Sequence, residues 1–268
     1  MSYSLARAAL RNGPEAFVEL SEAVVQKWER TRPPHDYEPD ADWEHHLHDM
    51  LGVDWPCAET GAAARVHAEA VQTLRERGIV VGPDAFVGWC DGDPATSRAL
   101  WCLIRHLRPT NAVETGVARG VTTRIILEAM ERNGHGRLWS IDLAPQLRPH
   151  LNHEIAAAVP DDRRQRWTLL EGSSRRRLAP LLSRLGAVEL FVHDSRHTTQ
   201  NLNFELTRVW RHLTAGGVAV ADDVDLNHGL PSFLAATTGH VSLVAPADLP
   251  DANRRYGRDL FAVVRRSP

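Results

Sequence analysis

The stretch Glu114-Thr115-Gly116-Val117-Ala118-Arg119-Gly120 decides how this sequence folds. It follows a short apolar run, Asn111-Ala112-Val113, and precedes residues 121–132, where apolar side chains recur at helical spacing. A strand, a glycine-containing turn and a helix in this order form one unit of an α/β sheet. Gly116 and Gly120 permit a tight turn and let a ligand approach the backbone closely.

The spacing of these glycines excludes two phosphate-binding motifs. A dinucleotide fingerprint needs a glycine two positions after Gly116, where Ala118 stands, and a P-loop needs lysine after its last glycine, where Val121 follows Gly120. The acidic Glu114 would also repel a pyrophosphate, whereas it suits a cofactor that carries an amino-acid moiety.

The rest of the chain repeats the alternation of strand and helix. Further strands are expected at residues 138–141, 167–170, 190–192, 218–221, 241–244 and 260–264. The helical spacing of Phe204 and Trp210 is expected to extend through Leu213, until Gly216-Gly217 ends the helix. These patterns predict an α/β fold of the Rossmann-like kind, with a seven-stranded, mostly parallel sheet flanked by helices.

The N-terminal part has a different pattern. Helical stretches at residues 5–30 and 61–77 flank the Pro- and Asp-rich segment 33–55, which is expected to be a long loop. We predict an N-terminal helical cap or lid over residues 1–95 and a catalytic domain over residues 96–268. Within the cap, the apolar Phe86–Asp91 is either part of a lid or an ordinary packing segment. The N-terminal helices pack either on a second subunit, in a homo-oligomer, or back over the pocket.

Composition favours a cytoplasmic protein with a small-molecule substrate. The chain has 31 basic and 34 acidic residues, so its charge gives no reason to expect nucleic acid or a membrane surface as a partner. No apolar run approaches the ~20 residues that span a bilayer. The three cysteines, Cys57, Cys90 and Cys102, are widely spaced and form neither a disulfide framework nor a zinc pattern. The histidines of 45–48 lack a partnering motif and are expected to be solvated or capping.

Polar residues follow the second and third strands, at the sheet edge where ligands bind in open α/β folds. Asp142 is placed to bind both hydroxyls of a ribose, the alternative being that it caps the next helix. The third strand ends in Gly172-Ser173-Ser174, whose small side chains leave room for an adenine. Ser174 offers a hydroxyl to that ring, or is a plain helix N-cap.

Carboxylates also follow the next two strands. Asp194 ends the fourth strand, and Asp222 and Asp223 end the fifth. Three carboxylates at adjacent strand ends repel one another unless a cation neutralises them, and Mg²⁺ prefers oxygen ligands. His197 stands three residues beyond Asp194, close enough for a general base, although a lone histidine is ordinarily a surface or core residue.

Together these motifs resemble those of the class I S-adenosylmethionine-dependent methyltransferases. More narrowly, they are similar to the metal-dependent small-molecule O-methyltransferases, namely the catechol type, the sugar O-methyltransferases of macrolide biosynthesis, and relatives labelled cephalosporin hydroxylase. The resemblance covers residues 96–268. It implies S-adenosylmethionine as cofactor and Mg²⁺ or another divalent cation as metal.

The resemblance also implies roles for single residues. The methionine end of the cofactor would be held by Glu114, Gly116 and Gly120, with support from Thr122. The remaining cofactor contacts would come from Asp142 at the ribose, from Gly172, Ser173 and Ser174 around the adenine, and from Asp194.

For the metal, the resemblance implies Asp194, Asp222 and Asp223 as ligands, where the catechol enzymes have asparagine at the third position. His197 occupies the place of a lysine base in the catechol type and of a histidine in the sugar type, which favours the sugar-like branch.

We therefore expect an O-methyltransferase that acts on a hydroxyl of a small molecule, such as a natural-product or sugar intermediate. In this hypothesis Asp194 and His197 are catalytic, and the methyl group passes in line to an oxygen that His197 has deprotonated. Two alternatives stay open. One is a metal-independent N- or carboxyl-methyltransferase, and the other is a non-catalytic homologue that only binds the cofactor.

Overall fold

The structure is a computed structural model, and it describes residues 13–29, 31–33, 35–81, 92–146, 148–248 and 259–268. The expected lid segment 86–91, which includes Cys90, and the first residues of the expected helix at 5–30 lie outside these ranges.

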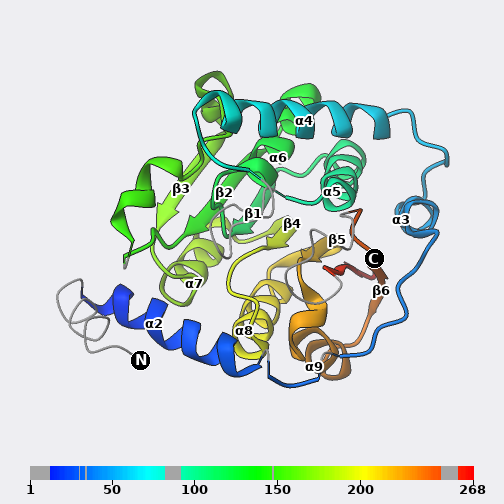
Figure 1. The fold of residues 1–268 in the computed structure, drawn as a ribbon. Helices are drawn as coiled ribbons and strands as arrows, with labels where there is room; N and C mark the ends of the chain where they lie inside the picture. The colour runs from blue at the N-terminus through cyan, green and yellow to red at the C-terminus, as the bar shows by residue number, and fades with distance from the viewer. Residues whose placement is uncertain (1–12, 30, 34, 82–91, 147, 249–258) are drawn as a thin grey trace.

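A seven-stranded sheet with the order β3-β2-β1-β4-β5-β7-β6 forms the centre of the molecule (Figure 1). Its strands are β1 (Asn111–Thr115), β2 (Arg137–Asp142), β3 (Trp167–Glu171), β4 (Val188–His193), β5 (Leu213–Ala221), β6 (His240–Ala245) and β7 (Phe261–Arg266). Strands β1 to β5 pair in parallel, and β7 is antiparallel to both β5 and β6. The predicted Rossmann-like, mostly parallel sheet is confirmed.

Helices cover both faces of the sheet. Side chains alternate along each strand, so Leu190 points into one hydrophobic cluster and Phe191 into another. The first cluster packs under α3 (Trp43–Leu51), α4 (Thr60–Glu76), α5 (Pro94–Leu107) and α6 (Val121–Asn133). The second packs under α7 (Ser174–Leu185), α8 (Thr199–Trp210) and α9 (Gly229–Ala236), and short 3₁₀ turns occur at Pro149–Glu154, Asp161–Arg166 and Val224–Leu226.

The chain order reverses at β1, which has β2 on one side and β4 on the other. The loops after β1 and β4 therefore leave the sheet toward opposite faces, and they part at the carboxyl ends of these strands. In open α/β sheets this is the place where a ligand binds.

Helix α2 (Pro14–Glu29) lies along the side of the molecule near α7 and α8 (Figure 1). Arg176 on α7 donates to Glu15 over 2.6 Å, and the backbone N–H of Thr199 donates to Glu29 over 3.0 Å. The helix thus folds back onto this chain, while its outer face leaves Phe17 and Trp28 exposed.

Three local predictions were wrong. The helix with Phe204 ends at Trp210, and β5 already begins at Leu213. Gly216 does not end an element, because its φ of +75°, next to a shift in the β4–β5 register, lets the strand continue through a bulge. The expected loop at 33–55 contains α3, whose Trp43 and Leu47 are buried one helical turn apart. Helix α5 was not expected at all.

Helix α5 begins at a standard N-terminal signal. The Asp93 side chain accepts hydrogen bonds from the N–H groups of Ala95 and Thr96, and Pro94 occupies the first helical position. Buried apolar residues of α3, α4 and α5 belong to the same cluster as one face of the sheet, so this part of the chain shares a core with the sheet. The domain boundary at residue 95 stays a prediction. Among the helices of the described ranges, none combines the length and apolarity needed to cross a bilayer.

The histidines of α3 divide into two groups. His45 and His46 pair with Asp42 and Asp40 over 3.2 and 2.6 Å near the surface, as expected for a solvated run. His48 differs, because its side chain is only 1% exposed.

Phe191, in the middle of β4, is fully buried. Phe191→Ala should lower the free energy of unfolding by about 3–5 kcal/mol because it leaves a cavity in the second cluster. Urea denaturation measures this change. The matched control is Phe17→Ala, a residue with 67% exposure, for which a change within about 0.5 kcal/mol is expected. Similar losses for both variants would mean that β4 is not a central strand.

Candidate active site at the strand ends

The turn after β1 lies directly against the backbone that follows β4. Gly116 has a φ of +88°, and a Cβ there would come within 2.0 Å of the carbonyl oxygen of Asp194. Gly120, with a φ of +82°, precedes α6, and its Cβ would lie 2.9 Å from the Cα of Ala156. Both positions therefore require glycine, for conformation and for space.

Asp142 holds this turn in place. Its Oδ2 accepts hydrogen bonds from the backbone N–H groups of Val117 and Ala118 over 3.2 and 3.0 Å, and burial raises the pKa of this carboxyl to about 6. The helix-cap alternative is not seen, since the next helical segment begins at Pro149 with Arg148 as its cap. Asp142 thus lies at the end of β2, beside the glycine-containing turn.

Glu114 supports the same turn from inside the protein. It is fully buried, and its Oε2 accepts from the hydroxyls of Ser140 and Thr123 over 2.6 and 2.9 Å. Burial raises its pKa to about 8. Its other oxygen, Oε1, is buried and has no hydrogen-bond partner among the described residues.

The segment after β3 lies beside Asp142. The N–H of Gly172 donates to the carbonyl of Asp142 over 2.8 Å. The N-cap of α7 is Ser173, without a side-chain capping bond, while the Ser174 hydroxyl donates to Asn201 over 3.4 Å. Ser174 is therefore not the N-cap, and its hydroxyl is directed toward α8.

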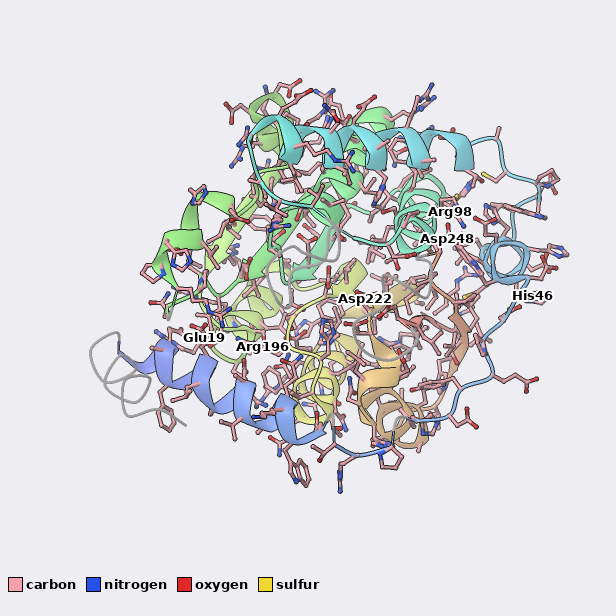
Figure 2. All side chains as sticks on the ribbon, viewed as in Figure 1. Glu19, His46, Arg98, Arg196, Asp222 and Asp248 are labelled. Carbon is pink, nitrogen blue, oxygen red and sulfur yellow. The ribbon has the colours of Figure 1, made fainter. Side chains whose placement is uncertain are left out.

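The three predicted metal ligands lie at the ends of two adjacent strands. The N–H of Asp222 donates to the carbonyl of His193 over 2.9 Å, which places it beside Asp194, and Figure 2 shows Asp222 near the middle of the molecule. Burial, and then the charge of Asp222, raises the pKa of Asp194 well above its usual range. Burial, and then the charge of Asp93, raises the pKa of Asp222 to about 7. This edge of the sheet therefore gathers carboxyl groups whose ionisation is opposed by burial and by one another.

The oxygens of Asp194, Asp222 and Asp223 are not gathered at coordination distance. In the part of the chain that the structure describes, the groups whose possible ligand atoms all lie within 4.8 Å of one another occur elsewhere, on and beside α3. Asp223 has a φ of +51°, a conformation that aspartate tolerates better than most residues, and its Oδ2 lies 3.5 Å from Nε2 of His197. The predicted base is thus next to Asp223. Thr122 is placed to donate to Asp194 over 3.5 Å.

Sequence patterns did not point to Glu205, the central side chain behind this edge. It is fully buried, and its Oε2 accepts from Thr115 and His193 over 2.5 and 2.6 Å. Its Oε1 accepts from Ser195 and Asn201 over 2.9 and 3.1 Å. One carboxylate therefore connects α8 to the ends of β1 and β4.

A signal for Glu205 was present in the sequence. Leu202, Leu206 and Val209 are the buried apolar residues of α8, and Glu205 stands on the same helical face. The expected stripe included Val209, but it also contained Phe204 and Trp210 and omitted Leu202 and Leu206, so it matched the buried face only in part. An acidic residue inside an apolar stripe indicates a buried carboxylate with partners.

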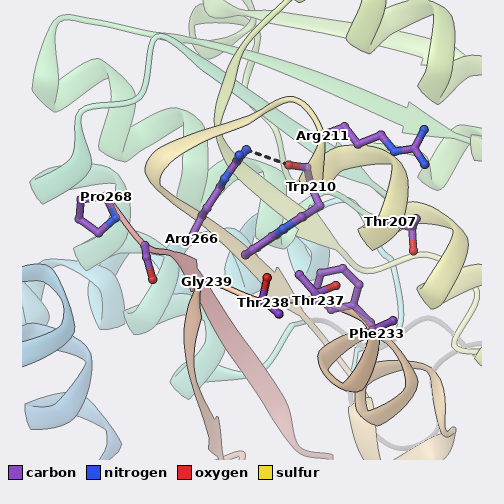
Figure 3. A pocket seen from close by; sticks show the side chains of 11 residues that line it. Thr207, Trp210, Arg211, Phe233, Thr237, Thr238, Gly239, Arg266 and Pro268 are labelled. Carbon is purple, nitrogen blue, oxygen red and sulfur yellow. Dashed lines mark hydrogen bonds between the residues drawn. The ribbon is translucent and has the colours of Figure 1, made fainter.

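The cavity in Figure 3 is separate from this edge. It has a volume of about 570 Å³ and lies between α8, α9 and the C-terminal residues, where Arg266 donates to the carbonyl of Trp210 over 3.1 Å. Trp210 precedes β5, so the cavity lies toward the amino end of that strand. None of the predicted site residues lines it.

Glu205→Gln should lower the free energy of unfolding by about 3 kcal/mol, because one amide cannot accept from four buried donors. Glu131→Gln, at an exposed position, is the matched control and should change it by less than about 0.5 kcal/mol. Equal values for both variants in urea denaturation would contradict the role of Glu205.

The same variant should change the pH dependence of stability. Burial opposes ionisation of Glu205, but its interactions with His193 and the hydroxyl donors outweigh this and hold its pKa below the usual range. A carboxyl with a lowered folded pKa stabilises fully above its unfolded pKa of about 4.3, and the stabilisation is lost as pH falls through the folded value. The fall in unfolding free energy below about pH 4.3 should therefore be shallower in Glu205→Gln than in the unmodified protein.

Residues 113–224 match a family model described as a methyltransferase domain. Among curated proteins, none matches the sequence. The match begins in β1 and ends just after Asp223, so it contains every predicted site residue.

Several solved structures share the fold. The O-methyltransferase TomG from Streptomyces achromogenes, involved in tomaymycin synthesis and solved with S-adenosylmethionine, has a TM-score of 0.53 and 16% identity, covering 76% of this chain and 90% of that one. An O-methyltransferase from Bacillus cereus, solved with S-adenosylhomocysteine, has a TM-score of 0.53 and 14% identity over 84% and 97% of the two chains. The methyltransferase PaMTH1 from Podospora anserina, also bound to S-adenosylhomocysteine, has a TM-score of 0.50 and 12% identity over 87% and 100%.

At these identities the structural likeness shows the fold, and the family model identifies residues 113–224 as similar to a methyltransferase domain. Residues 113–224 thus match a methyltransferase domain, and the chain has the fold of these solved methyltransferases.

Proposed function

We propose that this protein transfers the methyl group of S-adenosylmethionine to a hydroxyl of a small molecule, with a divalent cation at the strand ends. The observation that carries the proposal is the concentration of carboxylates around the Gly116 turn. Asp142, Asp194 and Asp222 all lie there with raised pKa values. S-adenosylmethionine carries an ammonium and a sulfonium group, so its positive charge complements this edge.

The cofactor contacts follow from the turn. The two glycines leave the backbone open to the methionine moiety, and Glu114 orients that backbone from the protein interior through Ser140 and Thr123. Asp142 is held by two amides of the turn, so its carboxylate is oriented before it meets the ribose hydroxyls. Gly172, Ser173 and Ser174 lie next to Asp142 and border the adenine.

The donor set at β4 and β5 fits a hard divalent cation. Asp194, Asp222 and Asp223 offer only oxygen, and the first two have raised pKa values partly because like charges face them, a repulsion that a cation removes. These three residues would hold the ion. When bound, the ion supplies Lewis acidity that lowers the pKa of a substrate hydroxyl.

The protein's own part in the reaction is deprotonation and alignment. His197 accepts the hydroxyl proton at Nε2, and Asp223, 3.5 Å from that atom, stabilises the resulting imidazolium. The acceptor oxygen forms a bond to the methyl carbon as the bond from that carbon to sulfur breaks. Holding the two reactants in line contributes up to about 7–11 kcal/mol of the rate enhancement. A histidine as base supports an acceptor of the sugar or natural-product kind.

One observation favours a second candidate. Since the three aspartates are not gathered within coordination distance, metal-independent methylation of an amine or a carboxylate is the alternative. Addition of a chelator separates the two. Loss of activity supports the metal-dependent O-methyltransferase, and unchanged activity supports the alternative.

Gly116→Ala should weaken binding of S-adenosylmethionine more than about tenfold, since the added Cβ meets the Asp194 backbone and displaces the turn. Calorimetry with S-adenosylmethionine, and with NAD as a ligand expected not to bind, measures this. Gly134→Ala is the control. Gly134 has a φ of +62°, but a Cβ there has no atom within 4 Å, so binding should be unchanged. Failure of the unmodified protein to bind S-adenosylmethionine would contradict the cofactor assignment.

Asp194→Asn should reduce Mg²⁺-dependent turnover by on the order of 100-fold, through loss of one charge at the reacting centre, while S-adenosylmethionine still binds. Release of S-adenosylhomocysteine across a panel of catechol and sugar acceptors gives the rate. Asp161→Asn changes an aspartate with 98% exposure and should leave the rate unaltered. If Asp194→Asn turns over normally with Mg²⁺ present, Asp194 does not serve the metal.

A further inference from the structure

A second group of side chains with metal-ligand chemistry lies in the helical layer above the sheet. His48 on α3, Cys57 before α4 and Cys102 on α5 place their possible ligand atoms within 4.8 Å of one another. Helices α3 and α5 pack together in this layer (Figure 1). The three residues come from three segments of the chain, so their spacing had no recognisable pattern in the sequence.

A fourth side chain completes the group. His106 stands one helical turn after Cys102 on α5, and its Nε2 lies 3.3 Å from Sγ of Cys57. The rings of His48 and His106 have their centroids 5.6 Å apart. Two cysteines and two histidines thus converge, which is a ligand set of structural zinc sites.

His48 is oriented as a metal ligand is. Its Nδ1 lies 2.6 Å from the carbonyl oxygen of Glu44, and because a carbonyl only accepts, Nδ1 carries the hydrogen. In the neutral ring Nε2 then holds a lone pair. This atom is buried and has no hydrogen-bond partner among the described residues, which is costly unless a ligand uses it. Metal-bound histidines commonly donate their other N–H to a carbonyl in this way.

The cysteines have surroundings that suit a bound cation. The backbone N–H of Glu59 donates to Sγ of Cys57 over 3.4 Å, and the ring of Trp55 lies 4.8 Å from that of His48 at the edge of the group. Cys102 is buried. Two thiolates would balance the charge of one divalent ion, so the complete centre would be neutral in this buried place.

The distances agree with a tetrahedral centre. With bonds of about 2.0 Å to nitrogen and 2.3 Å to sulfur, neighbouring ligand atoms lie about 3.3–3.8 Å apart. The 3.3 Å between Cys57 and His106 falls in this range, and the other three atoms lie within 4.8 Å of one another. His106 stands outside the group whose atoms all lie within 4.8 Å of one another, so its ring would have to move closer to His48 and Cys102 when an ion binds.

We propose that His48, Cys57, Cys102 and His106 form a closed structural site for a thiophilic divalent cation, zinc by its donor set. Four protein ligands leave no open position, so the site ties α3, the segment before α4 and α5 together and takes no part in methyl transfer. It is independent of the proposed function, because it stands on different residues and a different ligand chemistry.

The first test uses the full-length protein purified under reducing conditions from zinc-supplemented cells. Elemental analysis should find one zinc ion per chain. After removal of zinc, addition of Co²⁺ should produce thiolate-to-cobalt charge-transfer absorption, which oxygen ligands at the strand ends do not give. Absence of both zinc and this absorption would overturn the proposal. So would a Cys57–Cys102 disulfide, seen by intact mass, that persists as the stable form after zinc is offered to the reduced protein.

Variants assign the ligands. Cys57→Ser and His106→Gln should each lose zinc and the charge-transfer absorption, and should unfold at a lower temperature that zinc no longer raises. Cys90→Ser is the matched control and should keep the full zinc content. If a variant fails to fold, the cobalt spectrum of the unmodified protein still decides the proposal. Equal zinc content in folded Cys57→Ser and Cys90→Ser would contradict it.

Discussion

The carboxylate of Glu205 is the interaction on which the candidate site depends. It accepts hydrogen bonds from Thr115 at the end of β1 and from His193 and Ser195 around the end of β4. These two strands are neighbours, but their following loops leave toward opposite faces of the sheet. A buried charge with four donors is costly to disrupt, so it holds the two ends in register where the glycine turn meets the backbone of Asp194.

This arrangement gathers like charges on the ligand side. Asp142, Asp194 and Asp222 all have raised pKa values there, and Asp93 adds to the repulsion at Asp222. Repulsion between these carboxylates destabilises the protein without a ligand, and a bound cation would remove that repulsion. The fold therefore sacrifices some stability at the carboxyl ends of the strands, as functional sites commonly do.

Helix α5 connects the two parts of the molecule that have unusual chemistry. Its N-cap, Asp93, lies close enough to Asp222 to raise the pKa of that carboxyl, and its last turns carry Cys102 and His106. If α5 is held at its C-terminal end by a bound ion, Asp93 at its N-terminal end is fixed in position. The proposed zinc centre would in this way steady the N-terminal helices against the sheet without contacting the substrate.

The sequence by itself determined the sheet and the candidates at its edge. Strand and helix periodicity, the Gly116 and Gly120 spacing and the acidic residues after the strands are local patterns, so the parallel α/β fold followed from them. Local patterns also placed Asp142, Asp194 and Asp222 at strand ends, because parallel strands present their carboxyl ends at one edge. The sequence wrongly predicted that Gly216 ends a helix. A β-bulge depends on the pairing with the neighbouring strand, which local spacing does not show.

Only the tertiary structure decided which side chains meet across the fold. Glu205 meets His193 and Thr115 because α8 packs its buried face against the sheet at β4. His197 lies beside Asp223, which has a left-handed backbone conformation. Cys102 is more than 40 residues from His48 and Cys57 in the chain, and helix packing brings it to them. Contacts between residues far apart in sequence arise from the packing of whole elements, and no local spacing encodes them.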